Sequence, residues 1–226
     1  MRLRHRSPRV PGEASPAAEL SRRLQDARLY FVTPDRAPDA VLEIAAAAIR
    51  GGVDVLQLRQ KTLPRGDLLE LARGLRQLAV RNERLFVVND HVDIALLAAA
   101  DGVHLGPDDL SIESARRVAG DRLLIGASAS SVEAARRAVR QGADYLGSGP
   151  AFPTPIKAQK PVIGPAGIAA IGDAVRVPVF AIGGIDASNL AQLAAAGVRR
   201  ACVIRAIGDA ADPEAAARTL RGMLDE

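Results

Sequence analysis

Short apolar segments alternate with longer segments of helical character along most of the chain, and this alternation restricts the fold more than any other feature. Unbroken apolar strands of this kind are typical of a parallel sheet that is buried on both faces. About eight such strands, each followed by a helix, predict an α/β fold of the (β/α)₈ TIM-barrel type. The predicted strands are 29–33, 55–58, 85–88, 102–105, 123–127, 145–147, 179–182 and 201–204.

The segments between these strands begin near Asp or Ser and end at Gly, as helix capping favours. An open, doubly wound sheet is the structural alternative, but such sheets usually have a glycine-rich loop after the first strand, where this chain has Thr33-Pro34-Asp35. We expect one TIM-barrel catalytic domain over residues 16–226, preceded by a flexible basic tail over residues 1–15. The predicted helices are 17–25, 39–50, 64–81, 92–100, 111–118, 131–141, 165–173, 187–196 and 213–224.

Composition argues against several classes of protein. Hydrophobic residues make up 48% of the 226 residues and aromatic residues only 3%, so the core must consist mainly of aliphatic side chains. The net charge of +4 allows a nucleic-acid partner, but no aromatic side chains are interleaved with the arginines, as single-strand binding usually requires. No apolar stretch approaches the length of a membrane span. We expect small-molecule substrates and neither a nucleic-acid nor a membrane partner. The sequence does not decide whether the chain forms a homo-oligomer.

The single cysteine, Cys202, bears on the compartment. It lies in an apolar run and cannot form a disulfide within the chain, which fits a reducing, cytoplasmic environment. A catalytic thiol needs an electropositive, partly exposed site, so a core position is the expected role. The N-terminus is basic, but no apolar segment follows it, so it does not resemble a secretory signal.

Polar residues follow the ends of the predicted strands, where TIM barrels carry their active sites. After the second strand, alternation places Gln57, Arg59 and Lys61 on one side, and a guanidinium with an ammonium suits a phosphate or diphosphate. A solvated loop is the alternative, but Gln57 lies inside the apolar run, where a polar group needs a partner. Asp90 follows the third strand and Asp109 the fourth, and each alone could cap a helix. Together they predict a magnesium site that is completed by a phosphorylated substrate.

The later strands also end in polar or glycine-rich segments. The fifth strand ends at Ser128, and a long loop after the sixth strand contains Thr154 and Lys157, which can bind phosphate. Such a long loop is typical of a lid, although a Pro-rich linker is the alternative. Gly184 after the seventh strand, and Ile204 and Arg205 after the eighth, lie where TIM barrels commonly bind phosphate.

These segments resemble thiamine phosphate synthases in chain order over roughly residues 28–220. The segments are QLRQK (57–61), VVND (87–90), DGVHLGPDD (101–109), GADYLGSGPAFPTPIK (142–157), AIGGI (181–185) and VIRAI (203–207). The resemblance implies a transferase of thiamine biosynthesis that joins an aminopyrimidine diphosphate to a thiazole phosphate. The products would be thiamine phosphate and pyrophosphate, formed by a dissociative, Mg²⁺-assisted substitution.

The resemblance also implies roles for individual residues. The pyrimidine diphosphate would be held by Gln57, Arg59, Lys61, Asn89, Ser128 and Lys157, of which Arg59, Lys61, Ser128 and Lys157 would be catalytic. Asp90 and Asp109 would bind Mg²⁺. The thiazole phosphate would be held by Thr154, Pro155, Ile156, Gly184, Ile204 and Arg205.

Three positions test this assignment. Ile156 stands where the family often has Thr, and Arg205 where it often has Ser, although arginine can still neutralise a phosphate. A related thiazole tautomerase relies on a His shortly after the fifth strand, and this chain has Ser130 there, which favours the synthase. A non-catalytic barrel whose basic tail contacts a nucleic acid is the alternative from another class.

Overall fold

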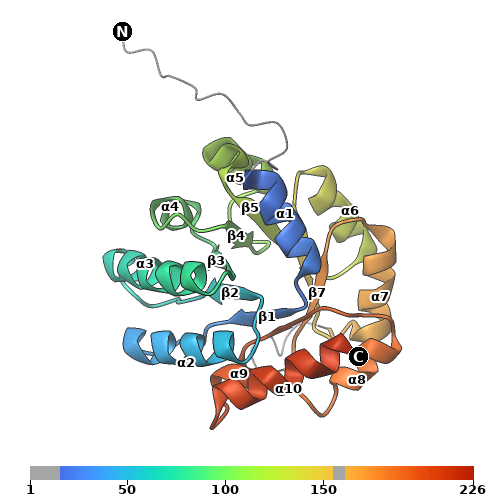
Figure 1. The fold of residues 1–226 in the computed structure, drawn as a ribbon. Helices are drawn as coiled ribbons and strands as arrows, with labels where there is room; N and C mark the ends of the chain where they lie inside the picture. The colour runs from blue at the N-terminus through green and yellow to red at the C-terminus, as the bar shows by residue number, and fades with distance from the viewer. Residues whose placement is uncertain (1–15, 155–160) are drawn as a thin grey trace, which may run out of the picture.

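The computed structural model describes residues 16–154 and 161–226, with side chains from Ala18 onward. Eight parallel strands close into one barrel in the order β1 to β8, and the helices surround it (Figure 1). The predicted TIM barrel is confirmed. The predicted tail, residues 1–15, lies outside the described residues, as do Pro155, Ile156 and Lys157. The strands are β1 (Leu29–Val32), β2 (Val55–Leu58), β3 (Leu85–Asn89), β4 (Gly102–Leu105), β5 (Leu124–Ala129), β6 (Tyr145–Ser148), β7 (Val179–Ile182) and β8 (Ala201–Val203).

The helices follow the predicted order with a few shifted ends. They are α1 (Pro16–Asp26), α2 (Pro38–Arg50), α3 (Arg65–Arg81), α4 (Val92–Leu97), α5 (Ile112–Ala119), α6 (Val132–Arg140), α7 (Gly164–Ala174), α8 (Leu190–Ala195), α9 (Arg205–Gly208) and α10 (Pro213–Asp225). Helix α9 and a 3₁₀ turn at Gly120–Arg122 were not predicted. None of the helices in the described part of the chain is long and apolar enough to cross a membrane.

Two helices are shorter than predicted because tertiary contacts override helix propensity. Helix α4 ends at Leu97, since Ala99 adopts φ 51° and the Asp101 N–H donates to Phe86 O at 2.8 Å, which begins the pairing of β4 with β3. Helix α8 begins only at Leu190. The preceding residues form a turn in which Ser188 N–H donates to the Asp186 carboxylate at 2.9 Å.

Aromatic side chains fill the inside of the barrel. Tyr30, Tyr145 and Phe180 are fully buried there, and the Tyr30 ring lies edge-on to Phe180 with 5.3 Å between the ring centroids. The two tyrosine hydroxyls lie 2.9 Å apart. A Cβ on Gly126 would come within 2.1 Å of the Tyr145 ring, so glycine is required where this ring crosses β5. Three of the six aromatic residues of the chain thus help to fill the space that the strands enclose.

Three aspartates form a repeated motif at the N-terminal end of the barrel. Asp54, Asp101 and Asp144 precede β2, β4 and β6, and each carboxylate accepts backbone N–H groups at the start of the preceding strand. Each also pairs with an arginine from a helix: Asp54 with Arg221 at 2.8 Å, Asp101 with Arg76 at 2.7 Å, and Asp144 with Arg116 at 2.6 Å.

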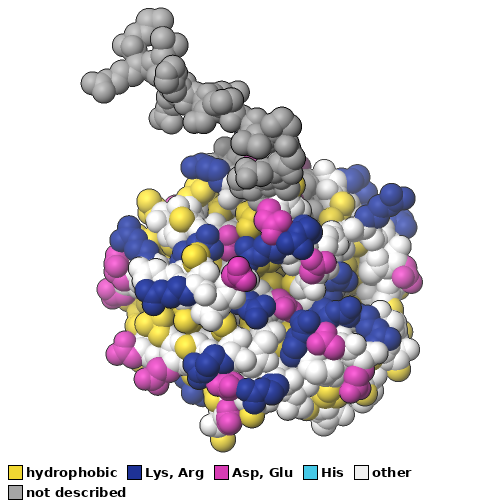
Figure 2. Space-filling model, viewed as in Figure 1, with side chains coloured by type: hydrophobic (Ala, Val, Ile, Leu, Met, Phe, Trp, Pro, Cys, Tyr) yellow, Lys and Arg dark blue, Asp and Glu magenta, His cyan; other side chains and the backbone are white. Residues whose placement is uncertain are grey.

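Positively and negatively charged side chains are interspersed over the face of the molecule seen in Figure 2.

Helices α1 and α10 pack against the barrel, which is closed by the pairing of β8 with β1. Leu24 of α1 is buried against the aromatic cluster inside the barrel, and α1 lies across the barrel in Figure 1. Helix α10 packs on the end of α2, where a Cβ on Gly51 would lie 2.4 Å from Glu214 O. The Arg50–Glu214 ion pair, at 2.7 Å, joins the same two helices. The N-terminal end of the barrel is therefore covered, which leaves the opposite end for ligands.

Candidate active site

A cavity of about 610 Å³ opens at the C-terminal ends of β5 to β8, and we call it the main cavity. The strand residues Ile182, Cys202 and Val203 give it an apolar floor. Cys202 is only 5% exposed, in agreement with the predicted core position, although it also borders the cavity. The cavity is lined by five of the predicted site residues, namely Ser128, Thr154, Gly184, Ile204 and Arg205.

Glycines allow the loops after β6 and β7 to approach each other at this cavity. Gly184 has φ 66°, and a Cβ there would lie 2.5 Å from Pro153 O. The loop after β6 is held to β7 by hydrogen bonds from Ala151 N–H to Ile182 O and from Phe152 N–H to Gly183 O, each at 2.9 Å. This contact positions Thr154 at the edge of the cavity.

A second cavity of about 440 Å³ contains the two aspartates predicted to bind magnesium, and we call it the acidic cavity. Asp90 has φ 63°, and its N–H donates to His104 O at 2.9 Å. The Asp109 carboxylate accepts the N–H of Gly106 at 2.8 Å. Neither aspartate caps a helix: His91 occupies the N-cap of α4, and the Ser111 side chain caps α5. The helix-cap alternative is therefore wrong.

The electrostatics of Asp90 reflect this arrangement. Burial raises the pKa of Asp90 to about 6, and a hydrogen bond with Asp109 together with the negative charge of Asp109 acts in the same direction. Lys61 and Arg59 lower the pKa of Asp90 by attraction. Two carboxyl groups thus lie within hydrogen-bonding distance of each other, with two cations close by.

The residues after β2 are arranged differently from the prediction. The strand ends at Leu58, so regular alternation does not extend to Lys61, whose side chain is exposed. The Arg59 N–H donates to Thr33 Oγ1 at 3.0 Å. Gln57 is only 4% exposed, and its Nε2 donates to the Tyr30 hydroxyl at 2.7 Å, so the partner that this polar group required is a tyrosine inside the barrel. Neither cavity is lined by Gln57 or by Asn89, which is half-buried at the end of β3.

Two polar side chains near the site were missed in the sequence. His104 of β4 lies with Nε2 3.1 Å from Ser128 Oγ, and a histidine inside an apolar strand was the available signal. Arg137 of α6 lines the main cavity, but in the sequence it resembles any solvated helix arginine. Within residues 16–154 and 161–226, no group of three or more His, Cys, Asp or Glu side chains could hold a metal ion, so the acidic cavity contributes only a pair.

Comparison with known proteins identifies the family. The family model described as thiamine monophosphate synthase matches residues 29–207. The chain belongs to the thiamine monophosphate synthase family. A relative from Thermosynechococcus vestitus, named thiamine-phosphate synthase, is 45% identical over 205 residues, which are 91% of this chain and 58% of that relative. This chain therefore spans less than two thirds of that relative's length.

Other members of the thiamine monophosphate synthase family match over nearly their whole length. A thiamine-phosphate synthase of Pyrococcus furiosus is 42% identical over 199 residues, which are 88% of this chain and 95% of the relative. The solved structure of a thiamine phosphate pyrophosphorylase from Pyrococcus furiosus superposes with a TM-score of 0.83 at 38% identity, covering 91% of this chain and 98% of that one. The resemblance inferred from the strand ends is confirmed.

Proposed function

We propose that this chain is a thiamine phosphate synthase that joins an aminopyrimidine diphosphate to a thiazole phosphate and releases pyrophosphate. The observation that carries the proposal is the Asp90–Asp109 pair, flanked by Arg59 and Lys61 at the C-terminal end of the barrel. The adjacent main cavity combines an apolar floor with the arginine Arg205, as a heteroaromatic ligand with a phosphate tail requires. Residues 16–226 would form the catalytic domain.

The acidic pair fits Mg²⁺. Asp90 and Asp109 offer carboxylate oxygens that are close enough to share a hydrogen bond, and Mg²⁺ is usually bound by one or two carboxylates together with substrate phosphates. When bound, Mg²⁺ would supply charge neutralisation for the departing pyrophosphate.

The chain's own residues would hold the diphosphate and stabilise its charge. Arg59 and Lys61 provide positive charge where negative charge grows on the leaving group, and Lys157 would add to it. Ser128, held by His104, would donate a hydrogen bond from the wall of the main cavity. Gln57 and Asn89 would orient the pyrimidine.

The thiazole phosphate would occupy the main cavity. Thr154, Pro155 and Ile156 would contact the ring, while Gly184, Ile204 and Arg205 would hold its phosphate. In a dissociative step, the bond between the pyrimidine methylene carbon and the diphosphate oxygen breaks first, and the electron pair leaves with pyrophosphate. The thiazole nitrogen then donates its own pair to the methylene carbon. This step needs no protein nucleophile, and a closed cavity would exclude competing water.

The test is a coupled assay of pyrophosphate release with Mg²⁺. The purified protein is incubated with the pyrimidine diphosphate alone, with the thiazole phosphate alone, and with both. Release only in the third reaction, at the rate at which thiamine phosphate forms, is expected. Isomerisation of a thiazole without pyrophosphate release would favour the tautomerase instead, and no turnover with both substrates would contradict the proposal.

A further inference from the structure

We infer that Arg137 of α6 is an additional phosphate-binding residue of the main cavity, approaching it from a different part of the barrel than Arg205. Neither the motifs at the strand ends nor the roles set out above include it. The inference rests on the proposed function, because it assigns Arg137 to the phosphate groups of the same substrates.

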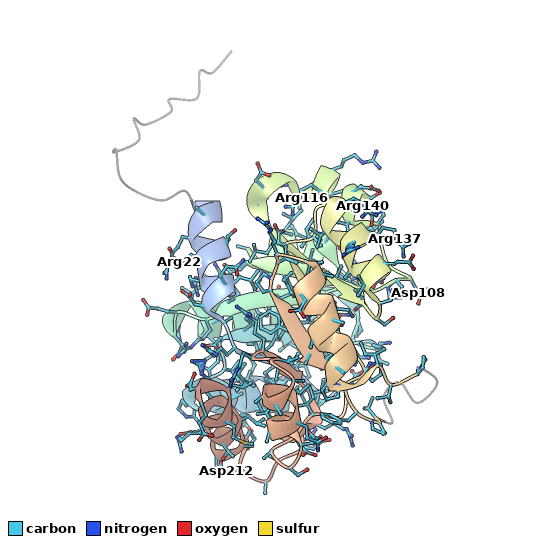
Figure 3. All side chains as sticks on the ribbon, turned by 90° about the vertical axis from the view of Figure 1, so that its right-hand side faces the viewer. Arg22, Asp108, Arg116, Arg137, Arg140 and Asp212 are labelled. Carbon is cyan, nitrogen blue, oxygen red and sulfur yellow. The ribbon has the colours of Figure 1, made fainter. Side chains whose placement is uncertain are left out.

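The direction of α6 brings Arg137 to the ligand end of the barrel. The helix begins at Val132, directly after β5 ends at Ala129, so its N-terminus lies at the mouth. Helical side chains tilt toward the N-terminus of their helix, so the long Arg137 side chain extends toward the mouth. Arg137 lines the main cavity together with Ala134, one turn earlier on the helix. In Figure 3, Arg137 lies nearer than Arg140 to the end marked by Asp108, and Arg22 of α1 marks the other end.

None of the ion pairs found in the described part of the chain joins Arg137 to a carboxylate of the cavity. Two carboxylates line the cavity, and both have partners: Asp209 pairs with Arg36 at 2.8 Å, and Asp186 accepts the Ser188 hydroxyl at 2.6 Å. Within the described part of the chain, neither Arg137 nor Arg205 forms an ion pair. Among the residues that the structure describes, the cavity therefore has an apolar floor, two arginines that form no ion pair, and one carboxylate, Asp186, whose partner is a hydroxyl and not a cation.

The two arginines approach the cavity from different sides. Arg137 follows β5 and Arg205 follows β8, three strands further around the barrel. On the Arg137 side, the cavity wall includes Ser128 and Pro107, and Pro107 belongs to the loop that also carries Asp109. Ser128 is assigned above to the diphosphate and Arg205 to the thiazole phosphate, and both line the same cavity as Arg137. The shared chemistry is a phosphate group, and it can come from either substrate.

The experiment measures binding of two probes, inorganic pyrophosphate with Mg²⁺ and the thiazole phosphate, by titration calorimetry. Arg137→Met is compared with Arg136→Met, since Arg136 is an exposed arginine next to it on α6 that does not line the cavity. We expect Arg137→Met to weaken at least one probe by roughly 3- to 10-fold, as for the loss of one partly solvated charged hydrogen bond. Arg137→Lys should retain part of the affinity, and Arg136→Met should bind both probes like the unmodified protein.

The two probes together identify which substrate provides the phosphate group that Arg137 binds. Weaker binding of pyrophosphate alone assigns Arg137 to the leaving group, and weaker binding of the thiazole phosphate alone assigns it to the acceptor. Equal affinities of Arg137→Met and Arg136→Met for both probes would overturn the inference. Absence of turnover in the unmodified protein would instead refute the proposed function, so the two failures are distinguishable. Arg137 is exposed, and matching thermal melts of the variants confirm that they fold.

Discussion

At the N-terminal end of the barrel, Asp54, Asp101 and Asp144 each accept backbone N–H groups and face an arginine. At the opposite end, Asp90 and Asp109 face each other, and burial with mutual repulsion raises the pKa of Asp90 to about 6. Aspartate side chains therefore stabilise the N-terminal end of the barrel, whereas at the C-terminal end they are held in an electrostatically unfavourable arrangement. Such an arrangement persists in a folded protein when a ligand compensates for it.

This contrast gives a way to separate fold from function. Changes at the N-terminal end should reduce the free energy of unfolding and spare turnover, because those carboxylates have all their partners within the protein. Changes at Asp90 in the acidic cavity should do the opposite, because the proposed partners of that carboxylate are the cation and the substrate.

Asp90→Ala should give the largest effect. With Mg²⁺ present, we expect kcat to fall by about a thousand-fold, since the stabilisation of the departing pyrophosphate is lost. The thermal midpoint should stay the same or rise, because one of two repelling carboxylates is removed. Asp109→Ala should lose kcat in the same way, but it also removes the acceptor of the Gly106 N–H and should lower the thermal midpoint slightly. Asp108→Ala serves as the matched control, since Asp108 lines neither cavity. Full activity of Asp90→Ala would refute the metal assignment.

Asp101→Ala should show the reverse pattern. Its carboxylate is 5% exposed, and its removal leaves the Phe86 N–H and the Arg76 guanidinium without their acceptor. We expect the free energy of unfolding to fall by about 2–4 kcal/mol in urea titrations, with kcat at low temperature nearly unchanged. Asp101→Asn keeps an acceptor for the N–H and should lose less. A large loss of kcat in a folded Asp101 variant would break the comparison between the two ends.

The smallest effect should be the pH dependence contributed by Asp90 without Mg²⁺. Its pKa is about 6 in the folded protein, against 3.8 for an ordinary aspartate, so between these values the folded state binds more protons. This group therefore lowers stability as pH rises from about 4 to about 6, and the loss persists above. Asp90→Asn should be more stable than the unmodified protein above pH 6 by about 1 kcal/mol, allowing for solvent screening at this half-buried site.

Chemical denaturation at a series of pH values, with and without Mg²⁺, measures this difference. It should shrink below about pH 4, where Asp90 is protonated in both states. Added Mg²⁺ should stabilise the unmodified protein and leave Asp90→Asn nearly unaffected. A stability difference independent of pH would show that Asp90 carries no unfavourable charge in the folded state.

Most of the barrel could be predicted, and so could the end of it at which Asp90 and Asp109 lie, because both depend on local sequence. A strand end such as Asn89-Asp90 identifies itself through an apolar run that stops at polar residues, and the barrel geometry then brings Asp90 and Asp109 to one end. Contacts set by three-dimensional packing could not be predicted. The hydrogen bond from Gln57 to Tyr30 crosses between strands, and the early end of α4 depends on the pairing of Asp101.

Arg137 illustrates the same limit at the surface. In the sequence it is one of several arginines on an amphipathic helix, and only the direction of its side chain relative to the cavity distinguishes it from Arg136. The ion pairs of the three aspartates at the N-terminal end of the barrel could not be predicted from the sequence either. The pair of Asp144 with Arg116, for example, joins residues that are 28 positions apart.

The ion pair between Asp54 and Arg221 has a consequence for protein synthesis. Asp54 joins β1 and β2, yet its closest arginine comes from α10, which is translated after every strand of the barrel. A nascent chain that has not yet emerged as far as α10 leaves this carboxylate without Arg221 and leaves α2 uncovered at Gly51. Closure of the barrel is late as well, since β8 is the last strand to be translated, and a chain stalled before β8 would expose two sheet edges to aggregation.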